Sequence, residues 1–141
     1  MTRVAAIDCG TNSIRLLVAD GHIGEDGRPH LSDLTRQMRI VRLGQGVDAR
    51  GYLDPAAISR AVEATVEYQR MIEKLGATSI RFVATSATRD ASNSAEFVRQ
   101  IKAVIGVEPE VVVGTQEASL SFRGAVGGLG ESLPGPMLVV D

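Results

Sequence analysis

The sequence has one cysteine and no long hydrophobic run, and these two shortages exclude whole classes of protein. A single cysteine cannot form a disulfide within the chain, so the fold does not depend on an oxidising compartment. No stretch of about 18 apolar residues is present, which argues against a membrane-spanning helix. The apolar run that follows Met1-Thr2-Arg3 is too short for a secretion signal. We therefore expect a cytoplasmic protein without a membrane partner.

An excess of positive charge is also missing. Lysine and arginine total 15 and aspartate and glutamate total 17, which gives a net charge of −2 and a pI near 5.7. This balance excludes the broad basic surface that binds nucleic acid, so an anionic ligand has to be bound locally. Almost all the positive charges are arginines, whose planar group of donors suits phosphate oxygens. The two histidines, His22 and His30, lack a ligand set at zinc-binding spacing, and no zinc site is predicted.

The length and hydrophobic content of the sequence predict one domain. Residues 1–141, of which 44% are hydrophobic, are long enough to form one core and too short for two ordinary domains. Short apolar runs between turn residues predict strands, and apolar residues at helical spacing predict helices. The predicted strands are 3–7, 14–19, 31–43, 79–84 and 110–113, and the predicted helices are 55–75, 94–105 and 116–126.

Polar residues mark where each predicted helix begins. Asp54-Pro55 is a helix-start pair, because aspartate can accept from free backbone amides while proline occupies the first helical position. Asn93, with Glu96 three residues later, predicts a capping box, in which each side chain bonds the other residue's backbone N–H. Thr115 is predicted to cap the last helix.

The predicted order of elements, β-β-β-α-β-α-β-α, is that of the ribonuclease-H-like, actin-like ATPase fold. We therefore predict an α/β domain with a mixed sheet and helices packed on it. Residues 127–136 carry four glycines and two prolines and are predicted to be a flexible connector before a truncated strand at 137–141. Because domains seldom end on a strand of the buried type, we expect this chain to be a fragment. Its resemblance to the actin-like fold implies that residues 1–141 are the N-terminal lobe of a larger two-lobed enzyme.

The first candidate site is a turn of small polar residues after the first strand. The carboxylate of Asp8 can hold a cation through water, while backbone N–H groups and hydroxyls of the turn face an anion. An ordinary hairpin, stabilised by its own polar side chains, explains the same residues. Cys9 has no histidine beside it in sequence and is interpreted as a packed small residue. The candidate anion-binding residues are Gly10, Thr11, Asn12 and Ser13, with Arg15 on the next strand either binding substrate or pairing on the surface.

The second candidate is a predicted loop of small hydroxyl residues that follows the strand at 79–84. The carboxyl ends of strands line the ligand crevice in open sheets, so backbone amides and one guanidinium are placed to bind phosphate there. In the alternative interpretation, Arg89 pairs with Asp90 or with another surface carboxylate. The candidate residues are Ser86, Ala87, Thr88 and Arg89.

The third candidate is Glu117, where a predicted strand passes into a helix. An acid in the first turn is favoured by the helix dipole, and this explanation is sufficient without catalysis. The functional interpretation makes Glu117 a base that orients water at the mouth of the crevice. Position alone favours the structural explanation.

Together these segments resemble the exopolyphosphatase and guanosine pentaphosphate phosphohydrolase family, a branch of the actin-like phosphotransferase superfamily. The resemblance runs nearly end to end, and the combination of motifs is more specific than any single one. The matching segments are Ala6–Leu17, Arg42–Asp48, Ala84–Ala91, Gly114–Ala118 and Leu138–Asp141.

The resemblance implies a role for each candidate residue. Glu117 would be the general base that activates water, and Asp8 would help to hold Mg²⁺. Asp141 would begin the family's second phosphate motif and act in metal binding and catalysis. Arg89 and the backbone of residues 85–88 would hold the terminal phosphate. The implied substrate is inorganic polyphosphate or guanosine pentaphosphate, and the complete protein is expected to be a homodimer.

Most of that second motif is missing, because its glycines and glutamate would follow Asp141. We therefore expect the chain by itself to have little or no hydrolase activity. Two other functions remain open from the sequence. One is a sugar or acetate kinase, or an ATPase, of the same superfamily. The other is a non-catalytic module that binds anions or a partner chain.

Overall fold

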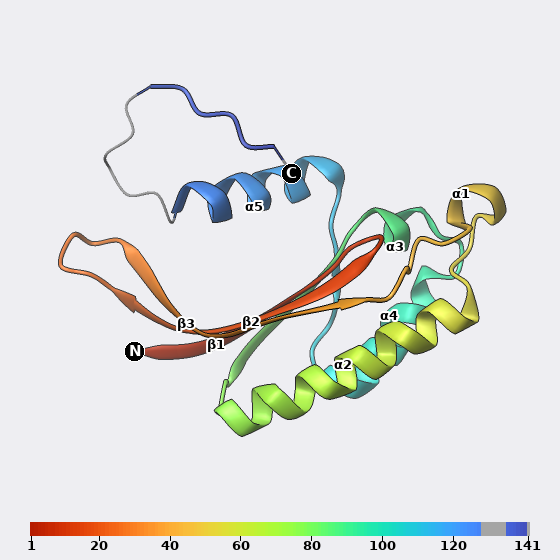
Figure 1. Ribbon diagram of the computed structural model, residues 1–141, viewed down its shortest axis with the longest axis horizontal. Helices are drawn as coiled ribbons and strands as arrows, with labels where there is room; N and C mark the ends of the chain where they lie inside the picture. The colour runs from red at the N-terminus through yellow and green to blue at the C-terminus, as the bar shows by residue number, and fades with distance from the viewer. Residues whose placement is uncertain (128–134, 141) are drawn as a thin grey trace.

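The fold is built on a five-stranded mixed sheet, seen in the computed structural model, which describes residues 1–127 and 135–140 (Figure 1). The strands lie in the order β3-β2-β1-β4-β5. The first three strands pair antiparallel, and β4 and β5 continue the sheet parallel to β1. Their bounds are Thr2–Cys9 for β1, Ser13–Ile23 for β2, Pro29–Ile40 for β3, Ser79–Ala84 for β4 and Glu110–Val111 for β5.

The third strand ends earlier than the sequence predicts. Its prediction extended to Leu43, whereas β3 stops at Ile40. The chain leaves the sheet there because the backbone N–H groups of Val41 and Arg42 both donate to the carbonyl of Asn12, each at 2.9 Å. Residues 41–43 therefore support the turn between β1 and β2 instead of extending the sheet.

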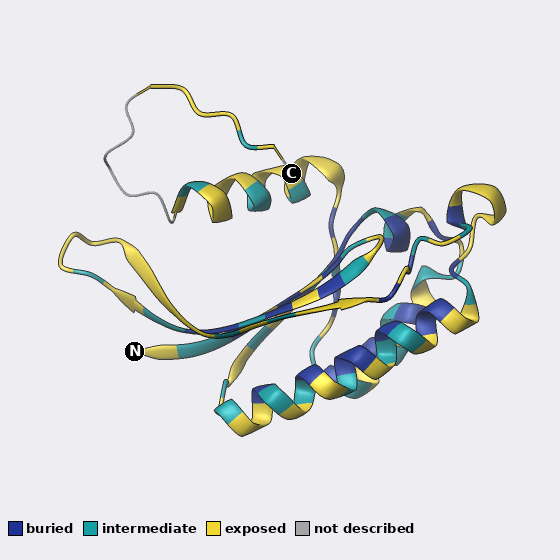
Figure 2. Cartoon of the chain, in the orientation of Figure 1, coloured by how far each residue is buried: buried dark blue, intermediate teal, exposed yellow. Residues whose placement is uncertain are grey.

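Two amphipathic helices cover one face of the sheet and form the core with it (Figures 1 and 2). These are α2, Pro55–Leu75, and α4, Ser94–Ile105, both of which were predicted. The side chain of Asp54 accepts a hydrogen bond from the Ala56 backbone at 2.8 Å, so the predicted start of α2 is confirmed. The buried side chains that the sheet contributes to this core are Ala5, Ile7, Cys9, Ile14, Leu16, Val18, Phe82 and Ala84.

The predicted capping box at α4 is wrong. The Asn93 side chain makes no capping bond. Its carboxamide instead accepts from the Leu53 backbone N–H at 2.8 Å and donates to the Leu53 carbonyl at 2.9 Å. These two bonds fasten the start of α4 to the segment before α2, and this tertiary contact uses the groups that the capping box would need.

Two short helices were not predicted. They are α1, Val47–Arg50, and α3, Ser86–Asp90. The second was expected to be a loop, but it forms a single helical turn in which the Arg89 N–H donates to the Thr85 carbonyl at 3.0 Å. Segments this short have no hydrophobic period from which a helix could be recognised.

The last helix lies over the opposite face of the sheet. It is α5, Gly114–Gly127, and none of its residues is buried (Figure 2). It begins one residue before Thr115, which was expected to cap it. Most of the predicted connector at 127–136, and Asp141, lie outside the described residues. None of the described helices is long and apolar enough to cross a membrane.

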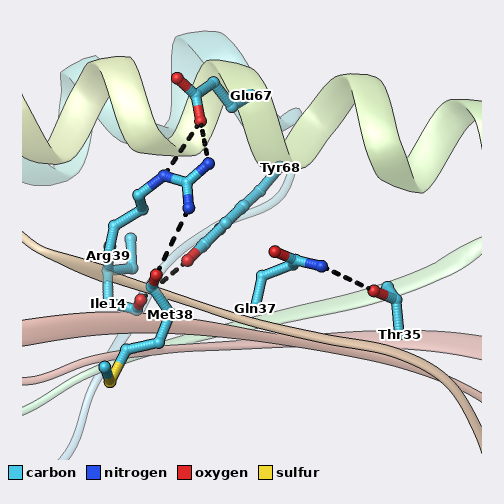
Figure 3. Close-up of polar contacts among 7 residues, drawn as sticks. All are labelled: Ile14, Thr35, Gln37, Met38, Arg39, Glu67 and Tyr68. Carbon is cyan, nitrogen blue, oxygen red and sulfur yellow. Dashed lines mark hydrogen bonds and ion pairs between the residues drawn. The ribbon is translucent and has the colours of Figure 1, made fainter.

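A buried tyrosine ties α2 to the middle of the sheet. The hydroxyl of Tyr68 donates to the Ile14 carbonyl at 2.8 Å, and its side chain is fully buried (Figure 3). Beside it, Arg39 of β3 pairs with Glu67 of α2 at 3.0 Å. Desolvation raises the pKa of Tyr68, so the hydroxyl stays protonated and remains a donor at neutral pH.

Replacing Tyr68 by phenylalanine tests this anchor. We expect Y68F to lower the free energy of unfolding by about 1 kcal/mol, because the Ile14 carbonyl loses a buried donor. Urea denaturation measures the difference. The matched control is Y52F, since Tyr52 is 40% exposed and only its ring lies near Arg50. Equal stability of the two variants would contradict the assigned role of the hydroxyl.

Candidate functional site

Backbone hydrogen bonds from the segment that follows β3 fix the turn between β1 and β2. Within the turn, the Gly10 N–H donates to the Ser13 carbonyl at 3.0 Å. The Gly44 N–H donates to the Thr11 carbonyl at 2.8 Å, next to the two bonds that the Asn12 carbonyl accepts. Thr11 and Asn12 remain exposed. The turn therefore presents its side chains to solvent while its backbone is fixed.

Gly44 is required by the close approach of these two segments. A Cβ atom at this position would lie 2.2 Å from Cγ2 of Thr11, which is far inside van der Waals contact. A second support comes from α2, where Arg60 donates to the Val41 carbonyl at 2.8 Å. The turn thus depends on residues that are some 30 to 50 positions away in the sequence.

The second predicted segment meets this turn directly. Oγ1 of Thr11 and Oγ of Ser86 lie 2.8 Å apart, a hydrogen bond between residues 75 positions apart. The Thr85 N–H also donates to the Cys9 carbonyl at 3.2 Å. Both contacts follow from the parallel pairing of β1 with β4, which brings the carboxyl ends of the two strands together.

The side chains of α3 are divided between the surface and the core. Ser86 is partly exposed, whereas Ala87 is 5% exposed and Thr88 is fully buried. Because the side chains of Ala87 and Thr88 are buried, these two residues can contact a ligand only through their backbone groups. Oγ1 of Thr88 has no hydrogen-bond partner within the described residues.

Arg89 connects α3 to the start of α5. Its Nη1 donates to the Val112 carbonyl at 2.9 Å and lies 3.7 Å from Oε2 of Glu117. Its Nε lies 3.5 Å from Oδ1 of Asp90. The pairing with Asp90, considered as an alternative from the sequence, is therefore present, but the arginine also reaches the predicted base. Its side chain is 30% exposed.

Glu117 and Asp8 face a common cleft of about 330 Å³ between α5 and the open face of the sheet. Arg15 lines the same cleft and lies directly opposite Asp8 in the β1–β2 register. Two carboxylates and an arginine that are distant in sequence thus share one cavity. The structure brings together candidates from the first and third predicted segments, with α3 at the same end of the sheet.

Arg81 also lines the cleft and was missed from the sequence. It donates to both carboxylate oxygens of Glu110, at 2.6 and 3.1 Å. These bonds lower the pKa of Glu110 and keep it ionised. The alternation of side chains along β4 was the available signal, since Arg81 and Val83 share a face while Phe82 is in the core.

The carboxylates of the cleft could supply only some of the ligands that a hard cation needs. Within the described residues, no group of three or more histidine, cysteine, aspartate or glutamate side chains could hold a metal ion. Mg²⁺ often takes only one or two protein carboxylates and completes its shell with water and phosphate oxygens. Asp8 fits that pattern. Asp141, the other predicted ligand, lies outside the described residues.

Cys9 faces the core, on the side of β1 opposite to Asp8. Its side chain is 1% exposed, and burial raises the pKa of the thiol to about 12, with a smaller contribution from the charge of Asp8. The interpretation of this residue as a packed small side chain is confirmed. Burial and the raised pKa of the thiol both argue against a nucleophilic role.

Comparison with known proteins identifies the family. Residues 22–141 match the Ppx/GppA phosphatase family. The chain belongs to this family. Exopolyphosphatase 2 of Mycobacterium tuberculosis is 51% identical to it over 146 residues, which cover the whole chain and 45% of that protein. The chain therefore spans less than half the length of this Ppx/GppA relative.

Solved structures of the Ppx/GppA family share the fold. An exopolyphosphatase-like protein superposes with a TM-score of 0.86 and 44% identity, covering 96% of this chain and 40% of that one. A family member from Aquifex aeolicus superposes with a TM-score of 0.79 and 32% identity, covering 91% and 40%. The ribonuclease-H-like, actin-like fold that the order of elements predicts is confirmed.

Substituting Gly44 tests the support of the turn. We expect G44A to lower the free energy of unfolding by about 1–3 kcal/mol, because the added methyl group forces Thr11 to move. The control is G124A in α5, where a Cβ meets no atom within 4 Å. That variant should be as stable as the wild type or slightly more stable, since alanine favours a helix. Thermal or urea denaturation distinguishes the two, and equal stability would contradict the close approach.

The burial of the Cys9 thiol can be tested by the rate of its chemical modification. At pH 8 we expect a thiol reagent to modify Cys9 only as fast as the protein opens, because the folded state offers no thiolate. The reaction should accelerate with urea in parallel with unfolding. No other cysteine contributes background. Reaction in the absence of urea at the rate of a free thiol would show that Cys9 is accessible.

Proposed function

We propose that the complete protein releases orthophosphate from the end of inorganic polyphosphate, and that this chain forms part of its catalytic site. The observation that carries the proposal is the contact of Thr11 with Ser86, which places the Asp8–Ser13 turn against the start of α3. The relative from Mycobacterium tuberculosis that covers the whole chain is named an exopolyphosphatase. Its name supports the substrate class.

The terminal phosphoryl group would lie between the turn and α3. The hydroxyls of Thr11 and Ser86 and the backbone N–H groups at the start of α3 are donors for its oxygens. Arg89 adds positive charge at the rim from the side of β5. Arg15 adds a second guanidinium from the sheet, in the cleft that Asp8 also lines.

Glu117 is the proposed general base. It projects into the cleft from the first turn of α5, and Arg89 lies close enough to orient its carboxylate. In the proposed step, Glu117 accepts a proton from water while the water oxygen bonds to the terminal phosphorus. The phosphoanhydride bond breaks, and its electron pair leaves with the shortened polyphosphate chain.

A divalent cation, Mg²⁺ in our proposal, would be held by Asp8 through water and by the phosphate oxygens of the substrate. When bound, it supplies positive charge that neutralises the phosphate groups. Asp141 would be a second carboxylate for the same purpose. The chain's own contribution is to bind the phosphate where the turn meets α3, at the adjacent hydroxyls of Thr11 and Ser86, and to direct water with Glu117.

The remaining parts of the proposal concern the complete protein. Guanosine pentaphosphate carries a terminal phosphoryl group of the same kind, so we propose it as a further substrate. We also propose that the complete protein is a homodimer located in the cytoplasm. Because the chain spans only 45% of its exopolyphosphatase relative, we expect further substrate-binding groups to come from the rest of the protein, and this chain alone to be inactive.

Replacing Glu117 by glutamine tests the base. In the complete protein we expect E117Q to lower kcat for orthophosphate release at least about 100-fold, with the binding of polyphosphate retained. The matched control is E63Q, because Glu63 is exposed on α2, on the other side of the sheet. It should leave kcat unchanged.

Two results would contradict the proposal. Unchanged turnover in E117Q would remove Glu117 from the mechanism. ATP-dependent phosphorylation of a small molecule by the wild type, without orthophosphate release from polyphosphate, would instead identify a kinase of the same fold.

A further inference from the structure

The arginines of the chain differ in whether a carboxylate neutralises them. Most of them form ion pairs within the described residues, and Arg60 donates to a backbone carbonyl. The guanidinium of Arg42 forms no ion pair and no hydrogen bond within the described part of the chain, although its residue adjoins the proposed phosphate turn. The arginines with a carboxylate partner are Arg3, Arg36, Arg39, Arg50, Arg81, Arg89 and Arg99.

The backbone of Arg42 is fixed against the turn on several sides. Its N–H donates to the Asn12 carbonyl at 2.9 Å, and its own carbonyl accepts from the Gln45 N–H at 3.1 Å. The preceding residue, Val41, is held by Asn12 and by the side chain of Arg60. The exposed side chain of Arg42 therefore starts from a Cα that cannot move independently of Asn12.

Arg42 also has an unfavourable backbone conformation. Its φ of 50° is positive, and within the described residues every other positive φ belongs to glycine. This region costs a residue with a Cβ about 1 kcal/mol or more, and glycine occupies it without that cost. An arginine here is disfavoured by the backbone. A side chain that binds a ligand accounts for its presence, since strained residues cluster at such sites.

We propose that Arg42 is a substrate-binding residue that holds a second phosphoryl group of the chain, next to the terminal group in the turn. The inference deepens the proposed function and rests on it. Polyphosphate carries negative charge on every phosphoryl group, so an exposed guanidinium on a residue whose backbone is hydrogen-bonded to the turn can recognise the chain in addition to its end. Arg42 would thereby favour polyphosphate over orthophosphate.

The test compares three variants of the complete protein. R42G removes the guanidinium and relieves the backbone strain, so its thermal stability should equal or exceed that of the wild type. R42K keeps the charge without the planar donors. The control is R70A, because Arg70 is exposed on α2. We expect R42G to raise KM for polyphosphate about tenfold with kcat nearly unchanged, R42K to have an intermediate effect, and R70A to have none.

Two further measurements separate this inference from the proposed function. Inhibition by orthophosphate should be the same in R42G and wild type, because orthophosphate occupies only the turn. Binding of inorganic tripolyphosphate, measured by calorimetry, should be weaker in R42G than in R70A. Weaker binding by R42G would support the role of Arg42 even if the wild type failed to release orthophosphate. That failure would contradict the proposed function and leave the inference about Arg42 intact. Equal binding by R42G, R70A and wild type, or no binding by the wild type, would overturn the role of Arg42.

Discussion

The parallel pairing of β1 with β4 is the constraint on which the candidate site depends. It places Cys9 opposite Ala84 at the carboxyl ends of the two strands, so the segments that follow them emerge side by side. The hydrogen bond between Thr11 and Ser86 becomes possible only through that register. A shift of one residue would turn Asp8 into the core and Cys9 toward the cleft, because side chains alternate between the two faces of a strand.

The two faces of the sheet have different tasks. The face under α2 and α4 is apolar and closely packed, and it carries the buried Tyr68 that fastens α2 to β2. The face under α5 carries charged side chains, and α5 contributes no buried residue of its own. A single strand therefore supplies side chains to both the core and the candidate site. In β1, Cys9 is in the core, whereas its neighbour Asp8 lines the cleft.

Several residues are placed at a cost in stability around the turn. Gly44 has no side chain, which allows Thr11 to approach closely. Arg42 has a positive φ. The hydroxyl of Thr88 is buried without a partner in the described part of the chain. The tight network of backbone bonds from residues 41–44 to the turn keeps such a conformation in place. In the proposed function, pre-organisation of this kind would reduce the conformational entropy that is lost when phosphate binds.

Elements with local signals could be predicted from the amino-acid sequence. The periodic apolar residues and the Asp54-Pro55 start predicted α2, and the order of strands and helices predicted the fold. The turn and Glu117 were also recognisable, since their motifs are continuous. The residues that face one another across the sheet became known only from the three-dimensional structure. It assigned the Asn93 carboxamide to Leu53 instead of to its own helix, made α3 helical, and put Arg81 in the cleft. These outcomes depend on strand register and on contacts between residues up to 75 positions apart, which local propensity does not encode.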